Sequence, residues 1–460
     1  MAELTSGGPQ HGRDGPRIAV FSMDAVGHLN PMLALVSALT GDPRHCRVRA
    51  YGSPALGALY RRAGAEFVPL DQRTPAPDSP PLSEPRPSDL AVRSFLAPQN
   101  GLDAVVNGVA RFAPDVVVHD VFDLRGAVAA RALGVPAAAV LPFAGLRALG
   151  DGFVRQHGSD HPALRAANAR LVRDFGTDVL GDPVCLPVLF PSRSLSLVTA
   201  VEAQSPPPGA AGMEALRFME RALGPALRWT GPWLGDVYWG EESAHAVAYE
   251  RAARRRAQGA LSVLFSLGTN ISTFRREAPM GGARSGAEYF DVALDLLLAA
   301  LGDDHRFHLL IARGSSEVRR AWPANAVVAD VLPQRALLAG AVDVFITHHG
   351  YNSTVEAVLH GVPAVALPGY GDQVANAAFS VARGVSVAHW DLRGPATSCT
   401  PDLLRRAVLD AASATGPAEA LPGVRRELLA GGGVGKAAEL VTELAAASCG
   451  VPRPRPGQAP

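Results

Sequence analysis

Hydrophobic positions along the chain alternate between short apolar runs and longer amphipathic segments. The first apolar run (RIAVFS) starts at Arg17, and runs of similar length recur in both halves of the sequence. Short continuous apolar runs are typical of strands buried on both faces, and the segments between them have helical periodicity. The alternation therefore predicts βαβ units, in which helices cover parallel sheets, and an α/β fold class.

In the first half, strands are predicted at Arg17–Ser22, Val48–Tyr51, Phe67–Leu70, Asp115–Val118 and Ala137–Val140. A helix is expected from about Pro31 to Leu39, because Asn30 is a good N-cap and proline suits the first helical turn. Residues 71–89 are rich in proline and acidic residues, which predicts a loop. The segment 145–225 mixes helical stretches with proline breaks and predicts no particular motif.

The second half repeats the same rhythm. Its predicted strands are Ser262–Leu267, Phe307–Ile311, Val327–Leu332, Val342–Thr347, Pro363–Leu367 and Ser386–His389. Helices are expected between them, at about 286–301, 334–340, 352–360 and 372–383.

A charged, helix-prone segment at 234–259 separates the two halves and is interpreted as an interdomain connection, although an exposed surface helix would give the same pattern. This break favours two successive doubly wound domains over one evenly spaced eight-fold barrel. The predicted division is a disordered leader 1–16, an N-terminal domain 17–233, the connection 234–259, a C-terminal domain 260–447 and a disordered tail 448–460.

Composition excludes several classes of function. The 43 basic and 43 acidic residues cancel, so no net field attracts a nucleic acid. The four cysteines (Cys46, Cys185, Cys399 and Cys449) lack the spacing of a disulfide framework or a zinc site, and no metal is expected. No apolar run reaches the roughly 18 residues of a membrane span, and the polar N-terminal segment does not look like a signal peptide, so a cytoplasmic location is expected.

The strongest chemical signal is the segment Val331–Asn376, VLPQRALLAGAVDVFITHHGYNSTVEAVLHGVPAVALPGYGDQVAN. A predicted strand ends at Thr347, a turn follows, and a helix begins near Asn352. Ligands of open α/β sheets lie beyond the carboxyl ends of the strands, and a helix N-terminus suits a phosphate. Gly350 lets the backbone approach such a ligand closely.

The side chains around this turn extend the same interpretation. His348, Asn352 and Ser353 offer hydrogen-bond donors, and Glu356 can accept hydrogen bonds from a vicinal diol such as ribose. Each residue alone is better explained as part of a helix cap or a polar loop. Together, and followed by Asp372-Gln373, they predict a site for a nucleotide diphosphate.

This segment resembles the signature of family 1 glycosyltransferases, which include plant natural-product enzymes and bacterial macrolide glycosyltransferases. The signature covers about 45 residues, and weaker similarity extends over most of the chain. The resemblance implies the GT-B fold, in which two Rossmann-like doubly wound domains face a central cleft. It implies that the diphosphate is held by His348, Asn352 and Ser353, the ribose by Glu356 and the sugar by Asp372 and Gln373, with Gln334 along the nucleoside. Gly350 and Leu332 of the same segment are also predicted to bind the donor.

Two further segments resemble the same family. VLFSLGTN (263–270) is similar to the opening strand of the nucleotide domain, which implies that Gly268 and Thr269 face the phosphates. RWTGPWL (228–234) is similar to the end of the acceptor domain. The chain departs from the family at Val331, where an aromatic residue commonly stacks on the base, and at His349, where many relatives carry Cys or Gly and to which no role is assigned.

The first βα turn, Ala25–Pro31, carries a GHxNP pattern that also resembles the family and implies that His28 is the general base. A helix N-terminus disfavours imidazolium, which keeps such a base neutral. Asp120, after a buried strand, is the preferred carboxylate partner for the ring, while Asp123 and Asp24 remain alternatives.

The function expected from the sequence is an inverting glycosyltransferase without a metal or other cofactor. A hexose from a nucleotide diphosphate sugar, either a UDP-sugar or a dTDP-sugar with UDP preferred, would move to a hydroxyl of a small, largely apolar acceptor such as a polyketide, macrolide or phenol. A sugar-nucleotide epimerase or hydrolase on the same fold is one alternative. A nucleotide-sugar-binding regulator or inactive partner protein is another, although binding alone does not require the base His28.

Two motifs are excluded by their context. A dehydrogenase needs GxGxxG directly after a strand, and the first strand is followed instead by MDAVG. The glycine-rich run Gly431–Lys436 follows a helical segment and lacks the terminal Ser or Thr of a phosphate-binding loop, so it predicts a helix-breaking turn.

Overall fold

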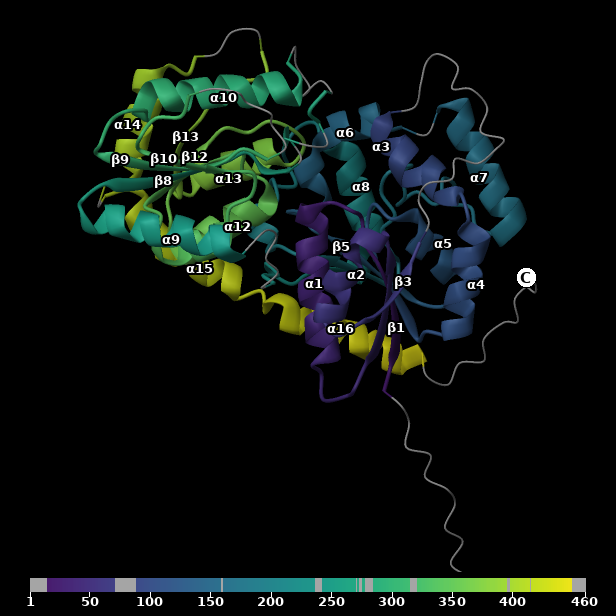
Figure 1. The fold of residues 1–460 in the computed structure, drawn as a ribbon. Coiled ribbons are helices and arrows are strands. Elements are labelled where there is room, and N and C mark those ends of the chain that lie inside the picture. The colour runs from purple at the N-terminus through teal and green to yellow at the C-terminus, as the bar shows by residue number, and fades with distance from the viewer. Residues whose placement is uncertain are drawn as a thin grey trace, which may run out of the picture.

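The computed structural model folds into two α/β domains that lie side by side (Figure 1). It describes residues 15–70, 88–158, 160–235, 242–269, 271–272, 275–277, 284–314, 321–394, 398–413 and 415–448. Nearly all of the predicted leader, most of the predicted loop 71–89 and the end of the chain from 449 lie outside the described residues.

The first domain is built on a seven-stranded parallel sheet in the order β3-β2-β1-β4-β5-β6-β7. Its strands are β1 (Arg17–Phe21), β2 (Arg47–Gly52), β3 (Glu66–Pro69), β4 (Val116–Asp120), β5 (Ala137–Leu141), β6 (Leu195–Val198) and β7 (Leu227–Trp229). Strands β1 to β5 match predicted strands. Strand β6 lies within the segment 145–225, and β7 comes just after it; neither was predicted.

The second domain is built on a six-stranded parallel sheet in the order β10-β9-β8-β11-β12-β13. Its strands are β8 (Leu261–Ser266), β9 (Phe307–Ala312), β10 (Ala326–Ala329), β11 (Val344–Thr347), β12 (Ala364–Ala366) and β13 (Ser386–His389). Both sheets have the doubly wound order, in which the winding reverses beside the first strand. The predicted fold class, two Rossmann-like domains, is confirmed.

Helices cover both faces of each sheet (Figure 1). In the first domain they are α1 (Val26–Thr40), α2 (Gly57–Arg62), α3 (Asp89–Ala91), α4 (Leu102–Phe112), α5 (Leu124–Ala132), α6 (Gly150–Gln156), α7 (Pro162–Phe175) and α8 (Glu214–Leu223). From residue 242 onward they are α9 (Glu242–Ala257), α10 (Gly286–Leu301), α11 (Gln334–Gly340), α12 (Tyr351–His360), α13 (Gln373–Ala382), α14 (Pro401–Ala411), α15 (Pro417–Leu429) and α16 (Gly433–Ser448).

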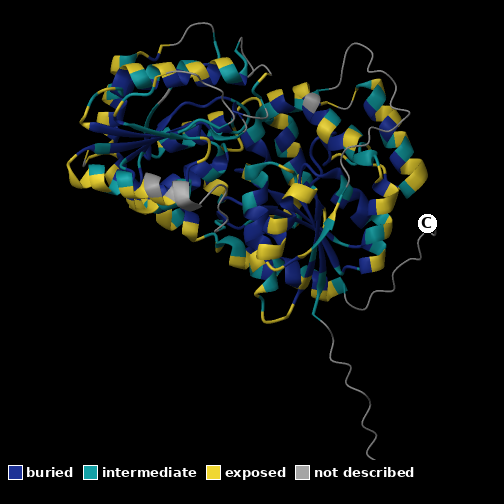
Figure 2. Ribbon diagram, viewed as in Figure 1, coloured by how far each residue is buried: buried dark blue, intermediate teal, exposed yellow. Residues whose placement is uncertain are grey.

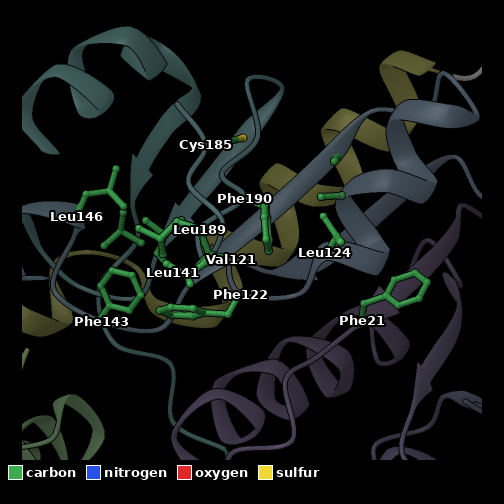
Figure 3. Packing of buried hydrophobic residues seen from close by; sticks show 14 of the residues in the cluster. Phe21, Val121, Phe122, Leu124, Leu141, Phe143, Leu146, Cys185, Leu189 and Phe190 are labelled. Atoms are coloured by element: carbon green, nitrogen blue, oxygen red, sulfur yellow. The ribbon is translucent and has the colours of Figure 1, made fainter. Parts of the chain in front are cut away.

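The central strands are buried on both faces, which explains their unbroken apolar runs. In β1, Ile18 and Val20 pack into one hydrophobic cluster, while Ala19 and Phe21 pack into another on the opposite face. Side chains alternate between the faces of a strand, so a strand covered on both sides needs apolar residues at every position. The central strands are accordingly buried in both domains (Figure 2), and Figure 3 shows Phe21 in the larger cluster.

Helix α1 begins five residues before the predicted start, and this changes the setting of His28. Ala25 is the N-cap, so His28 is the third helical residue and Asn30 is not a cap. A proline costs a helix one backbone hydrogen bond, to the carbonyl four residues earlier. For Pro31 that carbonyl belongs to Gly27, in the first turn, where a side chain from another element can satisfy it.

The predicted domain boundaries differ from the packing at two places. Helix α9, within the predicted connection 234–259, packs against β8 and β9 of the second sheet, where Ala252 is fully buried. Helix α16, predicted as part of the second domain, crosses back and packs on α1 of the first, with Ala437 and Val441 buried there (Figure 1). Helices α9 and α16 bury their apolar faces against these strands and against α1. Local periodicity predicts that a helix has an apolar face but not which distant element covers it.

Candidate active site

The predicted site residues lie at the point where the winding of each sheet reverses. In the first domain His28 follows β1 and Asp120 ends the neighbouring strand β4. In the second domain Gly268 follows β8 and His348 follows the neighbouring strand β11. All four lie beyond the carboxyl ends of their strands or at them, which is where doubly wound sheets bind ligands.

His28 and Asp120 form a hydrogen-bonded pair. His28 Nδ1 lies 2.8 Å from Asp120 Oδ2, and the backbone N–H of Phe122 donates to Asp120 Oδ1 at 2.8 Å. The Asp120 side chain is fully buried, whereas 22% of the His28 side chain is exposed. Since Nδ1 faces the carboxylate, Nε2 is the ring nitrogen that remains to exchange a proton with a ligand.

The pKa of His28 is raised above 6.5. Burial by itself lowers this pKa, but the negative charge of Asp120, its hydrogen bond and the more distant charge of Asp372 outweigh burial. The sequence-based expectation that the helix N-terminus sets the charge of this ring is therefore incomplete, because the nearby carboxylates act in the opposite direction.

The alternative partners of His28 have other settings. Asp123 caps α5 by accepting from the N–H of Arg125 at 2.9 Å and is ion-paired to the same arginine. Asp24 is exposed. His119 is buried, and its Nδ1 lies 2.9 Å from the carbonyl oxygen of Asp120.

In the second domain two glycines enclose the imidazole of His348. A Cβ at Gly268, where φ is +69°, would lie 2.5 Å from the ring, and a Cβ at Gly350 would lie 2.4 Å from Nε2. Only glycine fits at either position without displacing the ring. Burial lowers the pKa of His348 to about 3, with a smaller contribution from His349, so the ring is neutral near pH 7.

Helix α12 directs its N-terminus into the same space. Gly350 is its N-cap, and the first helical N–H groups have no partner within the helix. The Ser353 hydroxyl accepts from Gln334 Nε2 at 3.2 Å. The Asn352 side chain, expected on the diphosphate, donates across the cleft to the carbonyl oxygen of Gly27 at 2.9 Å, the acceptor that Pro31 leaves without an intrahelical N–H.

Glu356 and Gln334 are hydrogen-bonded to each other and line the cleft from the second domain. Gln334 Nε2 donates to Glu356 Oε2 at 2.6 Å. Burial raises the pKa of Glu356 to about 7, although the hydrogen bond from Gln334 and the charge of Arg335 oppose the shift. Leu332 is buried and lines the same cavity, as does Val331, which is 45% exposed.

Asp372 and Gln373 lie at the start of α13 and face the cleft. Asp372 Oδ2 accepts from Asn376 Nδ2 at 2.8 Å. Burial raises the pKa of Asp372 to about 6, opposed by the hydrogen bond from Asn376 and by the charge of His28. Gln373 Oε1 accepts from the N–H groups of Gly369 and Tyr370, both at 2.9 Å, and so holds the preceding loop.

One cavity of about 460 Å³ contains these residues. It is lined by every site residue that the sequence predicted except Asp120, which is fully buried behind His28: His28, Gly268, Thr269, Leu332, Gln334, His348, Gly350, Asn352, Ser353, Glu356, Asp372 and Gln373. Both domains contribute to it, as the predicted central cleft requires.

An aromatic wall completes the cavity on the side of the first domain, and sequence reasoning missed it. The ring of Phe122 meets the ring of His28 edge-on, with the ring centroids 5.1 Å apart. Its centroid lies 6.0 Å from that of Phe143 and 6.3 Å from that of Phe153. Figure 3 shows Phe122 and Phe143 side by side in the buried cluster. The buried residues of α8 (Leu216, Met219 and Leu223) follow a helical period that sequence analysis can detect. No such local pattern identifies the three phenylalanines as one wall.

Two tyrosines of the second domain also form hydrogen bonds to the first domain. The hydroxyl of Tyr351 donates to the carbonyl oxygen of Thr199, and the hydroxyl of Tyr370 donates to Gln156 Oε1 at 3.2 Å.

Among the described residues, no group of three or more His, Cys, Asp or Glu side chains is arranged to hold a metal ion. No helix in the described part of the chain is long and apolar enough to cross a membrane.

The sequence is similar to known glycosyltransferases. Residues 319–393 match the family described as "UDP-glucoronosyl and UDP-glucosyl transferase". The chain is 28% identical to the oleandomycin glycosyltransferase of Streptomyces antibioticus over 441 residues, which cover 92% of this chain and 90% of that protein.

Solved structures share the fold over almost the full length. The kitacinnamycin glycosyltransferase has a TM-score of 0.65 and 26% identity, covering 94% of this chain and 99% of its own. The glycosyltransferase VinC in complex with dTDP has a TM-score of 0.60 and 19% identity, covering 94% and 100%. With the doubly wound sheets and the shared cleft, these likenesses show that the chain is a glycosyltransferase with the GT-B fold, similar to UDP-glycosyltransferases and macrolide glycosyltransferases.

Proposed function

We propose that the enzyme transfers a hexose from a nucleotide diphosphate sugar to a hydroxyl of a small, largely apolar acceptor, with inversion at the anomeric carbon. The observation that carries this proposal is the pair of His28 and Asp120 at 2.8 Å, in a cavity that also contains Asp372 and the N-terminus of α12. A base oriented by a buried carboxylate, opposite a site for a phosphate leaving group, suits direct displacement.

The proposed reaction is a single displacement. His28 Nε2 takes the proton of the acceptor hydroxyl, and the hydroxyl oxygen forms a bond to the anomeric carbon. The bond from that carbon to the diphosphate oxygen breaks on the opposite face, and the diphosphate leaves with its electron pair. Asp120 stabilises the imidazolium that forms, and the free N–H groups of α12 stabilise the leaving diphosphate.

The contacts of the second domain support roles for the predicted donor residues. His348, held between Gly268 and Gly350, would contact the diphosphate together with Thr269, Ser353 and Asn352, whose amide would first have to leave the Gly27 carbonyl. Glu356 would accept from the ribose hydroxyls, with Leu332 and Gln334 along the nucleoside. Asp372 and Gln373 would bind the sugar hydroxyls.

We propose a UDP-sugar as the donor, because Glu356 suits a ribose that carries both hydroxyls. A dTDP-sugar is the alternative, and one relative by fold has been solved with dTDP. The acceptor is proposed to be a natural product such as a macrolide, polyketide or phenol. The wall of Phe122, Phe143 and Phe153 beside His28 supports an apolar acceptor, and the oleandomycin and kitacinnamycin glycosyltransferases are named after natural products.

Nucleotide binding tests the proposal first. The melting temperature of the protein is measured with UDP, dTDP, GDP and NAD. A ligand at 100 times its Kd adds about 2.7 kcal/mol of stability, which corresponds to several degrees. We expect a shift with UDP that disappears in Glu356→Ala. A shift with dTDP alone would redirect the donor assignment, and no shift with either nucleotide would contradict the site.

Turnover then separates the alternatives. The nucleoside diphosphate released from the bound class of donor is measured with and without a panel of phenolic and macrolide acceptors, for the wild type and His28→Ala. We expect release that depends on the acceptor and is lost in the variant. Consumption of the donor without acceptor, in both proteins, would indicate an epimerase or hydrolase, and binding without any turnover would indicate a regulator.

A further inference from the structure

The side chain of Asn376 connects two parts of the site that the sequence treats separately. It lies on α13, is 4% exposed, and its Nδ2 donates to Asp372 Oδ2 at 2.8 Å and to the carbonyl oxygen of His349 at 3.0 Å. An amide nitrogen carries two hydrogens, so these two bonds use its full donor capacity. The amide plane is thereby fixed, and with it one oxygen of the Asp372 carboxylate.

His349 is held in an unusual backbone conformation at the other end of this contact. Its φ is +57°, in the left-handed region that non-glycine residues adopt only where the surroundings hold them. The ring is 1% exposed, with Nδ1 3.3 Å from the carbonyl oxygen of Thr347 and Nε2 2.8 Å from Ser386 Oγ. A carbonyl can only accept, so Nδ1 carries the proton and the Ser386 hydroxyl can donate to Nε2.

These contacts form one continuous chain across three elements. Ser386 on β13 holds the ring of His349, the His349 backbone lies in the turn after β11, its carbonyl binds Asn376 on α13, and Asn376 binds Asp372. The same turn contains His348 and leads into α12. The arrangement therefore links the turn proposed to face the diphosphate with the carboxylate proposed to face the sugar.

We propose that His349 and Asn376 are positioning residues, which orient the Asp372 carboxylate toward the sugar of the donor without touching the donor. This inference rests on the proposed function, because the role of Asp372 toward the sugar is assigned there. The ring contacts of His349 to Thr347 and Ser386 hold the turn that carries the His349 carbonyl.

The role predicts an effect on binding of the sugar and not of the nucleotide. Dissociation constants for UDP and UDP-glucose, and for dTDP and dTDP-glucose, are measured by calorimetry on the full-length wild type, and the pair that binds is used throughout. The quantity compared is the ratio of the Kd of the nucleotide sugar to that of the free nucleotide. We expect this ratio to rise about tenfold in Asn376→Ala, because the carboxylate loses a fixed orientation and a hydrogen bond.

Substitutions at His349 separate its ring from its backbone. His349→Gly tolerates the positive φ and removes both ring contacts, so the ratio should rise several-fold. His349→Asn also tolerates this backbone and keeps an amide donor near the Thr347 carbonyl, so it should restore part of the loss. Asn325→Ala is the matched control, since Asn325 is a buried asparagine that binds the backbone at Leu301 and lies outside the cavity.

The outcomes are distinguishable. Binding of neither UDP nor dTDP by the wild type would overturn the proposed function and this inference with it. If the wild type binds the nucleotide but the ratio is unchanged in Asn376→Ala, the positioning role alone is overturned. This includes the case in which the nucleotide and the nucleotide sugar lose affinity equally. A rise in Asn325→Ala equal to that in Asn376→Ala would reduce the effect to general destabilisation and would also overturn it.

Discussion

Replacement of Glu356 by glutamine should stabilise the protein above neutral pH while weakening nucleotide binding. The carboxyl is 7% exposed and accepts a hydrogen bond from Gln334, and burial raises its pKa from 4.5 to about 7. A carboxyl whose pKa is raised by folding binds its proton more tightly in the folded chain than in the unfolded one. Unfolding free energy therefore falls as the pH rises from about 4.5 to about 7, and the full loss is present above that range.

The magnitude follows from the pKa. At 1.36 kcal/mol per pKa unit, the rise from 4.5 to about 7 corresponds to about 3 kcal/mol lost at pH 8 and largely retained at pH 5. Glutamine keeps the shape and the acceptor oxygen but carries no charge. The gain of Glu356→Gln over the wild type should therefore be larger at pH 8 than at pH 5, by up to roughly 6 to 12 °C in melting temperature for a domain of this size.

The assay is thermal unfolding of both proteins at pH 5 and pH 8, with Glu443→Gln, an exposed position on α16, as the matched control. The same variant should bind UDP, or dTDP if that is the ligand, about tenfold more weakly, because a neutral amide accepts less strongly from ribose hydroxyls than a carboxylate. An equal difference in melting temperature at the two pH values would refute the argument about the buried charge. Unchanged nucleotide affinity would refute the role toward ribose.

Three further predictions concern the base, the diphosphate turn and the base-stacking position. Asp120→Asn should lower kcat by about 100-fold or more and move the acidic limb of the pH profile of kcat/KM to lower pH, because the carboxylate that raises the pKa of His28 is lost; an unmoved limb would contradict the pairing. Gly268→Ala should weaken UDP binding about tenfold, since its Cβ would lie 2.5 Å from the imidazole in the turn, whereas Gly361→Ala, with a similar positive φ and open space, should leave the UDP affinity unchanged. Val331→Trp should tighten UDP binding several-fold in calorimetry by stacking on the base, because Val331 lines the cleft and is 45% exposed; equal or weaker binding would place the base elsewhere.

Local patterns were sufficient for the elements and for the chemistry of single turns. The strands of both sheet centres follow from unbroken apolar runs, and α10 begins where Ser285 and Glu288 form a capping box. Most residues of the second-domain site lie within one segment of sequence, so their shared place at the end of β11 and the start of α12 and α13 could be predicted; Gly268 and Thr269 come from the turn after β8. The comparisons with known proteins confirmed the predicted enzyme class, and the roles of the individual residues remain predictions.

Other features depend on contacts between distant parts of the chain. The pairing of His28 with Asp120 requires β1 and β4 to be neighbours in the sheet, although 92 residues separate the two side chains. The sequence could propose that pairing only with alternatives, because Asp120, Asp123 and Asp24 all lie at or just after the ends of neighbouring strands. The sheet order brings Asp120 to the ring and leaves Asp123 as a helix cap.

The sequence by itself predicted the α/β class, the two-domain rhythm and the segment proposed to bind the nucleotide, because each follows from periodicity or from residues close along the chain. The candidate base was predicted from the family resemblance of its GHxNP pattern. Only the tertiary structure decided the aromatic wall around His28, the contact of Asn352 with Gly27, the packing of α16 on the first domain and the link from His349 through Asn376 to Asp372. These depend on how separate elements meet, and burial and hydrogen bonding between them are set by the whole fold and not by any local run of residues.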